Sequence, residues 1–367
     1  MQRICDQGVH IATELRAEHP WLLWCLPVAG LGVVGFYKLM RTEGQGTNDI
    51  IEAVHHGKGL SILLLPAIFV GTILTHLCGG SAGREGAALQ MGGSIGSGIG
   101  KMFRLNETDM HVAVMCGMSA CFAALFGTPI AATVFAMEVV SVGVMYYAAL
   151  VPCVFSSLFA VEIARFFGVK GEEMAIALVP EFTATNAGKI VLISILCATL
   201  SIAFCILMHE TGKIAKKYLP NPYIRIFVVG FVIVLVNLLL NTQDYLGAGM
   251  EVIEHAVEHG QTNPEAFLIK MFLTALTLGV GFKGGEIVPS FYVGATFGCL
   301  MGQLLGISPS MCAAVGMIAL FCGVTNSPIT SLLLSFELFG LEGVYFVLIG
   351  VAVSYMLSGY YSLYHSQ

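Results

Sequence analysis

Long apolar stretches recur along almost the whole chain; several approach the length that crosses a membrane, and others are shorter and broken by glycine. A helix that spans the hydrocarbon core of a bilayer needs roughly 20 predominantly apolar residues. Charged residues make up only 11% of the 367 residues, against about 25% in soluble domains. The sequence therefore predicts an all-α, polytopic membrane protein. The stretches lie at 21–40, 60–78, 110–126, 130–160, 190–208, 224–240, 266–282, 290–306, 311–324 and 343–357.

Residues 1–20 differ from the rest of the chain because they are rich in charged side chains and lack an apolar core. This pattern predicts an amphipathic helix that ends at His19-Pro20, and it is not typical of a signal peptide. The remainder divides into two parts, 21–180 and 181–367, which we expect to form one transmembrane domain. No polar stretch is long enough for a cytoplasmic regulatory domain.

Three short blocks occur twice in the same order, which indicates an internal repeat. Gly44-Gln45-Gly46-Thr47-Asn48 resembles Gly247-Ala248-Gly249-Met250-Glu251. The acidic block Gly83-Arg84-Glu85-Gly86 has its counterpart in Lys283-Gly284-Gly285-Glu286-Ile287-Val288-Pro289. In the third block, Pro129 precedes Glu138 and Pro328 precedes Glu337, each by nine positions. The sequence therefore predicts two related halves whose helices are broken at matching places.

Repeated halves with glycine- and proline-interrupted helices are typical of secondary transporters, whose substrates bind near the bilayer midplane. A helix N-terminus carries about half a positive charge and free N–H groups, which favour anions. Glu85 lies at such a place, and a carboxylate in hydrocarbon costs about 2.5 kcal/mol or more. These features together predict anion transport, with Glu85 able to occupy the anion site.

The repeated blocks resemble the CLC superfamily of chloride channels and proton-coupled antiporters, from about Pro20 to the C-terminus. Gly44–Asn48 stands where the family has Gly-Ser-Gly-x-Pro, and Gly83–Gly86 matches Gly-Lys/Arg-Glu-Gly-Pro. Gly285–Pro289 matches Gly-x-Phe-x-Pro, and Leu363-Tyr364 matches the Leu-Tyr that supplies the family's central tyrosine. The resemblance implies a fold of two inverted-topology repeats with tilted and broken helices. It also implies a homodimer with one pathway per subunit, in the bacterial inner membrane.

Departures from the family pattern resemble its bacterial fluoride/proton antiporter branch. Gln45 replaces the serine of the first loop, and Gly285-Glu286 precedes Ile287 in place of the usual phenylalanine motif. Val139 stands where chloride/proton antiporters carry a second, inward relay glutamate. The resemblance thus implies export of fluoride in exchange for protons, with one carboxyl group that anion and proton use in turn.

The resemblance assigns gating and proton coupling to Glu85 and Glu286. Supporting backbone positions are Gly44, Asn48, Gly83, Gly285 and Pro289. We expect fluoride, protons and membrane lipid as partners, and no metal, cofactor or nucleic acid. The expected anion-binding residues are Gln45, Gly46, Arg84, Glu85, Gly86, Glu286, Ile287, Val288 and Tyr364.

Several residues have a second, structural interpretation. Glu286 could instead cap a helix through nearby N–H groups. Arg84 could steer anions or anchor the chain at the interface, and Asn48 could cap the following helix or touch the anion. Glu138 and Glu337 are expected to cap or pair at helix ends.

Two other functions stay open. A chloride/proton antiporter or a passive chloride channel of the same superfamily would share the motifs. An intramembrane enzyme would need a converging nucleophile or metal triad, and the metalloprotease motif His-Glu-x-x-His does not occur in the sequence. The eleven cysteines are scattered through apolar segments without metal-ligand spacing. The sequence therefore favours a transporter and not an enzyme.

Overall fold

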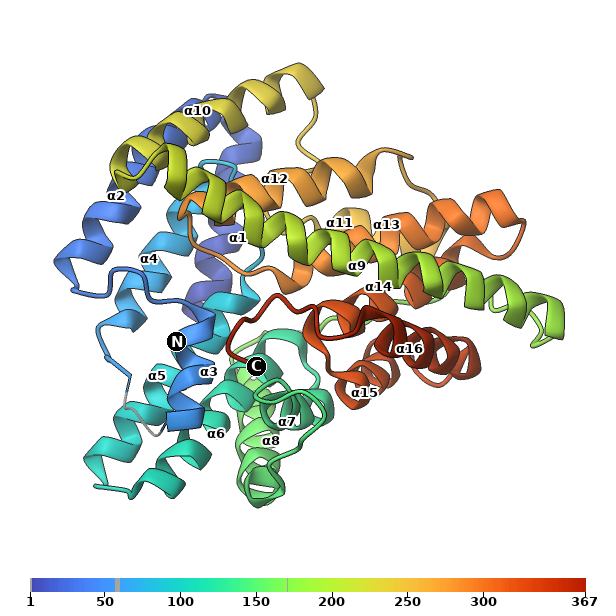
Figure 1. Cartoon of the computed structure of the whole chain (residues 1–367), viewed down its shortest axis with the longest axis horizontal. Coiled ribbons are helices and arrows are strands. Elements are labelled where there is room, and N and C mark those ends of the chain that lie inside the picture. Colours follow the sequence, from blue (N-terminus) through green and yellow to red (C-terminus); the bar gives the residue numbers. More distant parts are fainter. Residues whose placement is uncertain (1, 57–59, 170) are drawn as a thin grey trace.

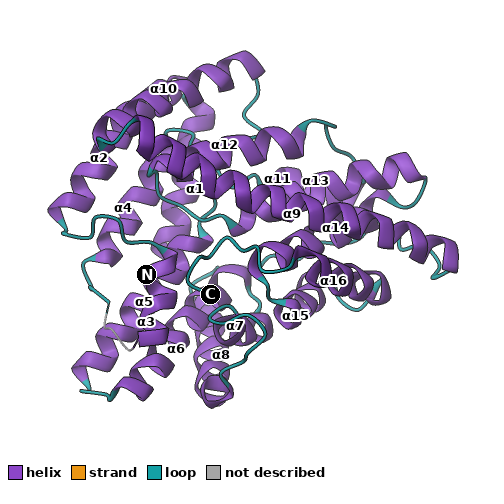
Figure 2. Cartoon of the chain, viewed as in Figure 1, coloured by secondary structure: helices purple, strands orange, loops and turns teal. Residues whose placement is uncertain are grey.

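The structure is a computed structural model that describes residues 2–56, 60–169 and 171–367, and these are almost entirely helical (Figures 1 and 2). Loops and two short 3₁₀ turns, η1 (Pro20–Cys25) and η2 (Tyr147–Ala149), connect the helices. The prediction of an all-α protein is confirmed. The helices are α1 (Gln2–Glu18), α2 (Leu26–Leu39), α3 (Thr47–His56), α4 (Leu64–Leu77), α5 (Glu85–Met102), α6 (Glu107–Phe126), α7 (Pro129–Glu138), α8 (Leu150–Phe166), α9 (Ala184–Tyr218), α10 (Pro222–Leu240), α11 (Met250–His259), α12 (Ala266–Val280), α13 (Ile287–Leu305), α14 (Pro309–Thr325), α15 (Pro328–Phe339) and α16 (Val344–Ser358).

Proline and glycine set several of these boundaries locally. Pro129 and Pro328 occupy the first positions of α7 and α15, where the missing N–H of proline costs nothing and its φ already suits a helix. Gly127 ends α6 in the left-handed region, with φ of 75°, which glycine adopts without a steric penalty. α1 ends at Glu18, just before the predicted stop at His19-Pro20.

The helices fall into two length classes, as the broken apolar stretches predicted. Six helical segments are long and apolar enough to cross a membrane, among the residues that the structure describes. Six other apolar helices have 10–17 residues, and they are shorter than the roughly 20 residues that a bilayer-spanning helix needs. The longest helix, α9, crosses the whole molecule and packs against α12, α14 and α16 (Figure 1).

The two halves meet through contacts between equivalent residues. Gly83 and Gly285 form an isolated antiparallel bridge in which each N–H donates to the other's carbonyl oxygen, both at 2.8 Å. Nearby, the Ser81 N–H donates to Thr277 Oγ1, and the Lys283 N–H donates to Thr75 Oγ1, both at 3.2 Å. Such reciprocal contacts are the signature of a two-fold relation. They agree with the predicted inverted repeats.

A second reciprocal contact joins α7 and α15. The carboxylate of Glu337 accepts from the N–H groups of Ile130 and Ala131 at 2.9 and 2.7 Å, at the start of α7. The carboxylate of Glu138 accepts from the Ile329 and Thr330 N–H groups at 3.1 and 2.8 Å, at the start of α15.

Each glutamate therefore caps the partner helix, and the prediction that Glu138 and Glu337 act at helix ends is confirmed. The predicted boundary between 180 and 181 lies in the non-helical segment before α9, and it stays a prediction.

Candidate functional site

Glu85 lies where the N-termini of α5 and α13 meet. Its side chain is fully buried, and its Oε1 accepts a hydrogen bond from the Val288 N–H at 2.9 Å. Its Oε2 is also buried and has no hydrogen-bond partner among the described residues. The carboxylate of one repeat thus occupies the helix N-terminus of the other, a place suited to an anion.

Glycine is required around this carboxylate because there is no room for a side chain. A Cβ atom at Gly83 or Gly285 would overlap the carboxylate of Glu85. A Cβ at Gly86 would approach the Gly284 carbonyl oxygen to 2.8 Å, which is closer than side chains normally allow. The predicted supporting glycines therefore let two backbones close around Glu85. Pro289, also predicted, is buried in the first turn of α13.

Arg84 and Glu286 occupy equivalent positions in the two repeats, since each directly follows a glycine of the Gly83–Gly285 bridge. The structural counterpart of Glu85 is therefore Ile287 and not Glu286. Glu286 is the N-cap residue of α13, but its side chain makes no capping hydrogen bond, which disfavours the helix-cap interpretation. Glu286 is partly exposed.

The structure gives Arg84 a protein partner. Its Nη2 lies 2.9 Å from Oε1 of Glu172, and both side chains are about four-fifths buried, with exposed fractions of 19% and 20%. The pair links the start of α5 to the segment that follows α8. Arg84 is thus anchored by an ion pair, a role that differs from both of the interpretations given above.

Tyr364 reaches the site from the C-terminal segment. The segment is fixed by the Leu363 N–H, which donates to the Val324 carbonyl at 2.9 Å. The Tyr364 hydroxyl is buried and has no hydrogen-bond partner among the described residues. Glu286 and Glu85 are the carboxylates close enough to act electrostatically on this phenol. The structure therefore brings together three of the predicted residues, although they are far apart in sequence.

The first Gly-x-Gly loop is tied to the segment that leads into α13. The Lys283 ammonium donates to the Gln45 carbonyl at 3.2 Å, and it lies 4.2 Å from the centre of the Tyr37 ring. The Gln45 side-chain oxygen is buried without a partner among the described residues. A buried amide oxygen is costly to leave without a hydrogen bond, so this oxygen is available as an acceptor in the first Gly-x-Gly loop.

The other predicted residues of this loop take part in local contacts. The Gly46 N–H donates to Asp49 Oδ2 at 2.7 Å, so Asp49 caps the start of α3. Asn48 Oδ1 accepts from the Ser366 N–H at 3.4 Å. Asn48 therefore holds the C-terminal segment and does not cap α3.

Lys270 is a residue that the sequence analysis missed. It is completely buried in α12, and its ammonium donates to the carbonyl oxygens of Gly247 and Tyr245 at 2.6 and 3.2 Å. It thereby ties the second Gly-x-Gly loop as Lys283 ties the first. The signal was present, because a lysine inside the apolar stretch 266–282 is expected to have a specific role.

No group of three histidine, cysteine, aspartate or glutamate side chains that could hold a metal ion occurs in the described part of the chain. The ten cysteines whose side chains are described are free thiols, and most are buried in helices.

Comparison with known proteins identifies relatives over nearly the whole chain. The model of the family described as voltage gated chloride channel matches residues 29–359. A chloride/fluoride channel protein of Pseudomonas syringae pv. tomato is 35% identical over 364 residues, which cover 97% of this chain and 80% of the relative. An H(+)/Cl(−) exchange transporter of Vibrio cholerae is 28% identical, covering 91% of this chain and 77% of the relative.

Solved structures give the same result for the fold. The crystal structure of a CLC-type fluoride/proton antiporter superposes with a TM-score of 0.96 and 30% identity, covering 100% of this chain and 93% of that one. A slow cyanobacterial Cl⁻/H⁺ antiporter superposes with a TM-score of 0.80 at 22% identity, covering 97% of this chain and 89% of that one. The predicted fold of inverted repeats is confirmed.

Proposed function

We propose that this chain, which belongs to the voltage gated chloride channel family, exports fluoride in exchange for protons. The family members compared above are channels and transporters, and this multi-pass membrane protein is a transporter and not an enzyme. The observation that carries the proposal is the buried Glu85 carboxylate, held by the Val288 N–H at the N-terminus of α13.

Glu85 and fluoride would compete for the same donors. When ionised, the carboxylate fills the α13 N-terminus and excludes an anion of the same charge. Protonation removes that charge, so the side chain leaves and fluoride takes its place. Because a single carboxyl group alternates between proton and anion site, proton and fluoride move in opposite directions. Glu286, which acts electrostatically on Tyr364 as Glu85 does, would share the proton with Glu85.

Fluoride is the substrate that the donors favour. A small, strongly hydrated anion needs several short hydrogen bonds to replace its water. The Val288 and Ile287 N–H groups, the Tyr364 hydroxyl and the Gln45 side chain would supply them, with Gly46, Gly86 and Arg84 shaping the surroundings. Arg84 would act through its ion pair with Glu172. The names of two relatives support fluoride.

Chloride is the second candidate. The Vibrio cholerae relative is named as an H(+)/Cl(−) exchange transporter, and the glycine motifs alone do not separate the two anions. We further propose a homodimer with one pathway per subunit, embedded in lipid of the bacterial inner membrane.

Ion flux from liposomes that contain the purified protein tests the proposal. Fluoride and chloride electrodes run in parallel with a pH electrode. We expect fluoride efflux with proton uptake and little chloride efflux. Chloride efflux equal to or faster than fluoride efflux would refute the fluoride assignment and leave the family unchanged.

The role of Glu85 is tested separately in the same liposomes. Glu85→Gln keeps the shape of the side chain but cannot exchange a proton, so proton uptake should vanish while fluoride flux changes or stops. Glu173→Gln removes an equal charge from an exposed position and should retain wild-type fluxes. Wild-type proton uptake in Glu85→Gln would overturn the assignment.

A further inference from the structure

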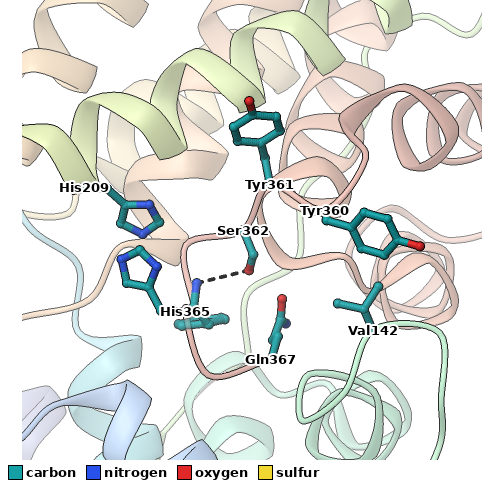
Figure 3. A pocket seen from close by; sticks show the side chains of 8 residues that line it. Val142, His209, Tyr360, Tyr361, Ser362, His365 and Gln367 are labelled. Carbon is teal, nitrogen blue, oxygen red and sulfur yellow. Dashed lines mark hydrogen bonds between the residues drawn. The ribbon is translucent and has the colours of Figure 1, made fainter.

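A pocket of about 270 Å³ opens beside Tyr364 (Figure 3). It lies between the C-terminal segment, the end of α9 and the segment that follows α7. Its lining combines two imidazoles with phenol, hydroxyl and amide groups. The lining residues are Val142, His209, Tyr360, Tyr361, Ser362, Tyr364, His365 and Gln367.

His209 and His365 lie against each other at one side of this pocket (Figure 3). Their ring centres are 3.6 Å apart and the rings are inclined by 27°, so they are stacked. His209 is half-buried on α9, whereas His365 is exposed. His209 Nε2 lies 3.3 Å from the Leu363 carbonyl oxygen, which fixes the ring beside Tyr364.

Imidazole is the only group in this lining that exchanges protons readily near neutral pH. Phenols, hydroxyls and amides keep their protons there. The charged groups close enough to His209 to act on it are His365, Lys213 and Glu210. Placing a positive charge on both stacked rings costs free energy, because like charges at this separation repel.

Tyr364 connects this pocket with the anion site. It lines the pocket, and its buried phenol interacts electrostatically with Glu286 and Glu85. The pocket therefore adjoins the anion site at Tyr364.

The charges near the end of α9 indicate which side of the membrane this is. Lys213, Lys216 and Lys217 follow His209 within two turns of the same helix. Loops and helix ends rich in lysine and arginine face the cytoplasm. This charge pattern favours the cytoplasmic side for the pocket.

We propose that the stacked His209–His365 pair transfers protons between the cytoplasm and the Glu85–Glu286 site through this pocket. In the release step, a carboxylic acid gives its proton to a neutral imidazole, through pocket water. An O–H bond breaks, an N–H bond forms, and carboxylate and imidazolium result. The imidazolium then gives the proton to the solvent, and the neutral pair is restored. This inference rests on the proposed exchange of fluoride for protons.

His209→Gln/His365→Gln tests the proposal in the liposome flux assay, with the full chain. The matched control is His255→Gln/His259→Gln, which removes another stacked pair, with ring centres 4.9 Å apart on α11. We expect the fluoride flux and the proton flux of the first variant to fall about tenfold. Positioned acid–base groups accelerate proton transfer by factors of this order or larger. The fluoride-to-proton ratio should stay at the wild-type value. The control should keep wild-type rates.

Chemical rescue separates a proton-transfer role from a structural one. Imidazole added to the bath should restore at least half of the lost flux, whereas the same concentration of the bulkier buffer HEPES should not. Unchanged rates, a loss that imidazole does not restore, or an altered ratio would each overturn the proposal. If the double variant aggregates, the single variant His365→Gln tests the proposal, because it changes an exposed ring. It should lower both fluxes, and added imidazole should restore them. Fluoride flux without proton uptake in the wild type would instead refute the proposed function.

Discussion

The reciprocal caps of α7 and α15 lead to a quantitative prediction, because the two glutamates are equivalent in sequence but differ in burial. Glu138 is 4% exposed, and it accepts three hydrogen bonds, including one from Thr330 Oγ1 at 2.7 Å. Glu337 is only partly buried and accepts two, one of them from the exposed Ile130. Removal of Glu138 should therefore destabilise the protein more than removal of Glu337.

The magnitudes follow from the groups left without partners. Glu138→Ala loses three hydrogen bonds to a charged acceptor and leaves buried N–H groups unpaired, which should lower the free energy of unfolding by about 3–5 kcal/mol. Glu337→Ala loses a helix cap that water can partly replace, so we expect a loss of about 1–2 kcal/mol. Glu→Gln at either position keeps one acceptor oxygen and should give an intermediate loss.

Reversible unfolding in mixed detergent micelles, followed by circular dichroism, measures these differences. Glu173→Ala, at an exposed position, is the control and should change the free energy of unfolding by less than about 0.5 kcal/mol. An equal or larger loss in Glu337→Ala than in Glu138→Ala would show that burial does not govern the strength of these caps. A loss below about 1 kcal/mol in Glu138→Ala would refute the hydrogen-bond argument itself.

Three further predictions concern the site. Gly285→Ala places a Cβ against the Glu85 carboxylate. The overpacking cost of about 1–3 kcal/mol should reduce fluoride flux by about 5- to 150-fold. Gly188→Ala, where a Cβ meets nothing within 4 Å, should keep wild-type flux. Tyr364→Phe removes a buried hydroxyl that has no partner among the described residues, so the unfolding temperature of the ligand-free protein should not fall. The rise in that temperature on adding fluoride should shrink, by an amount that corresponds to about 1.5–3 kcal/mol of binding free energy. An undiminished rise would exclude a hydrogen bond from Tyr364 to fluoride. In the same unfolding assay, a double-mutant cycle on Arg84 and Glu172 should give a coupling free energy of about 1 kcal/mol, which falls as salt is added. A coupling free energy of zero would contradict the ion pair.

Much of the fold follows from signals that act within one helical turn. The lengths of the apolar stretches predicted membrane helices, and the fixed φ of Pro129 and Pro328 suits the first positions of α7 and α15. The repeated Gly-x-Gly and acidic blocks predicted two related halves. These signals are local because chain length, the fixed φ of proline and the freedom of glycine need no distant partner.

Only the tertiary structure decided which residues face each other. The sequence placed Glu85 and Glu286 in matching acidic blocks, and the Gly83–Gly285 bridge shows that the position equivalent to Glu85 is Ile287. The mutual capping of Glu138 and Glu337, about two hundred positions apart, could be expected only as a role at some helix end.

The same holds for the Arg84–Glu172 ion pair and for the stacked rings of His209 and His365. Such contacts join residues far apart in the chain, so no local pattern encodes them. They are fixed when the two inverted halves pack together, because buried polar groups must then find partners that the surrounding lipid cannot supply.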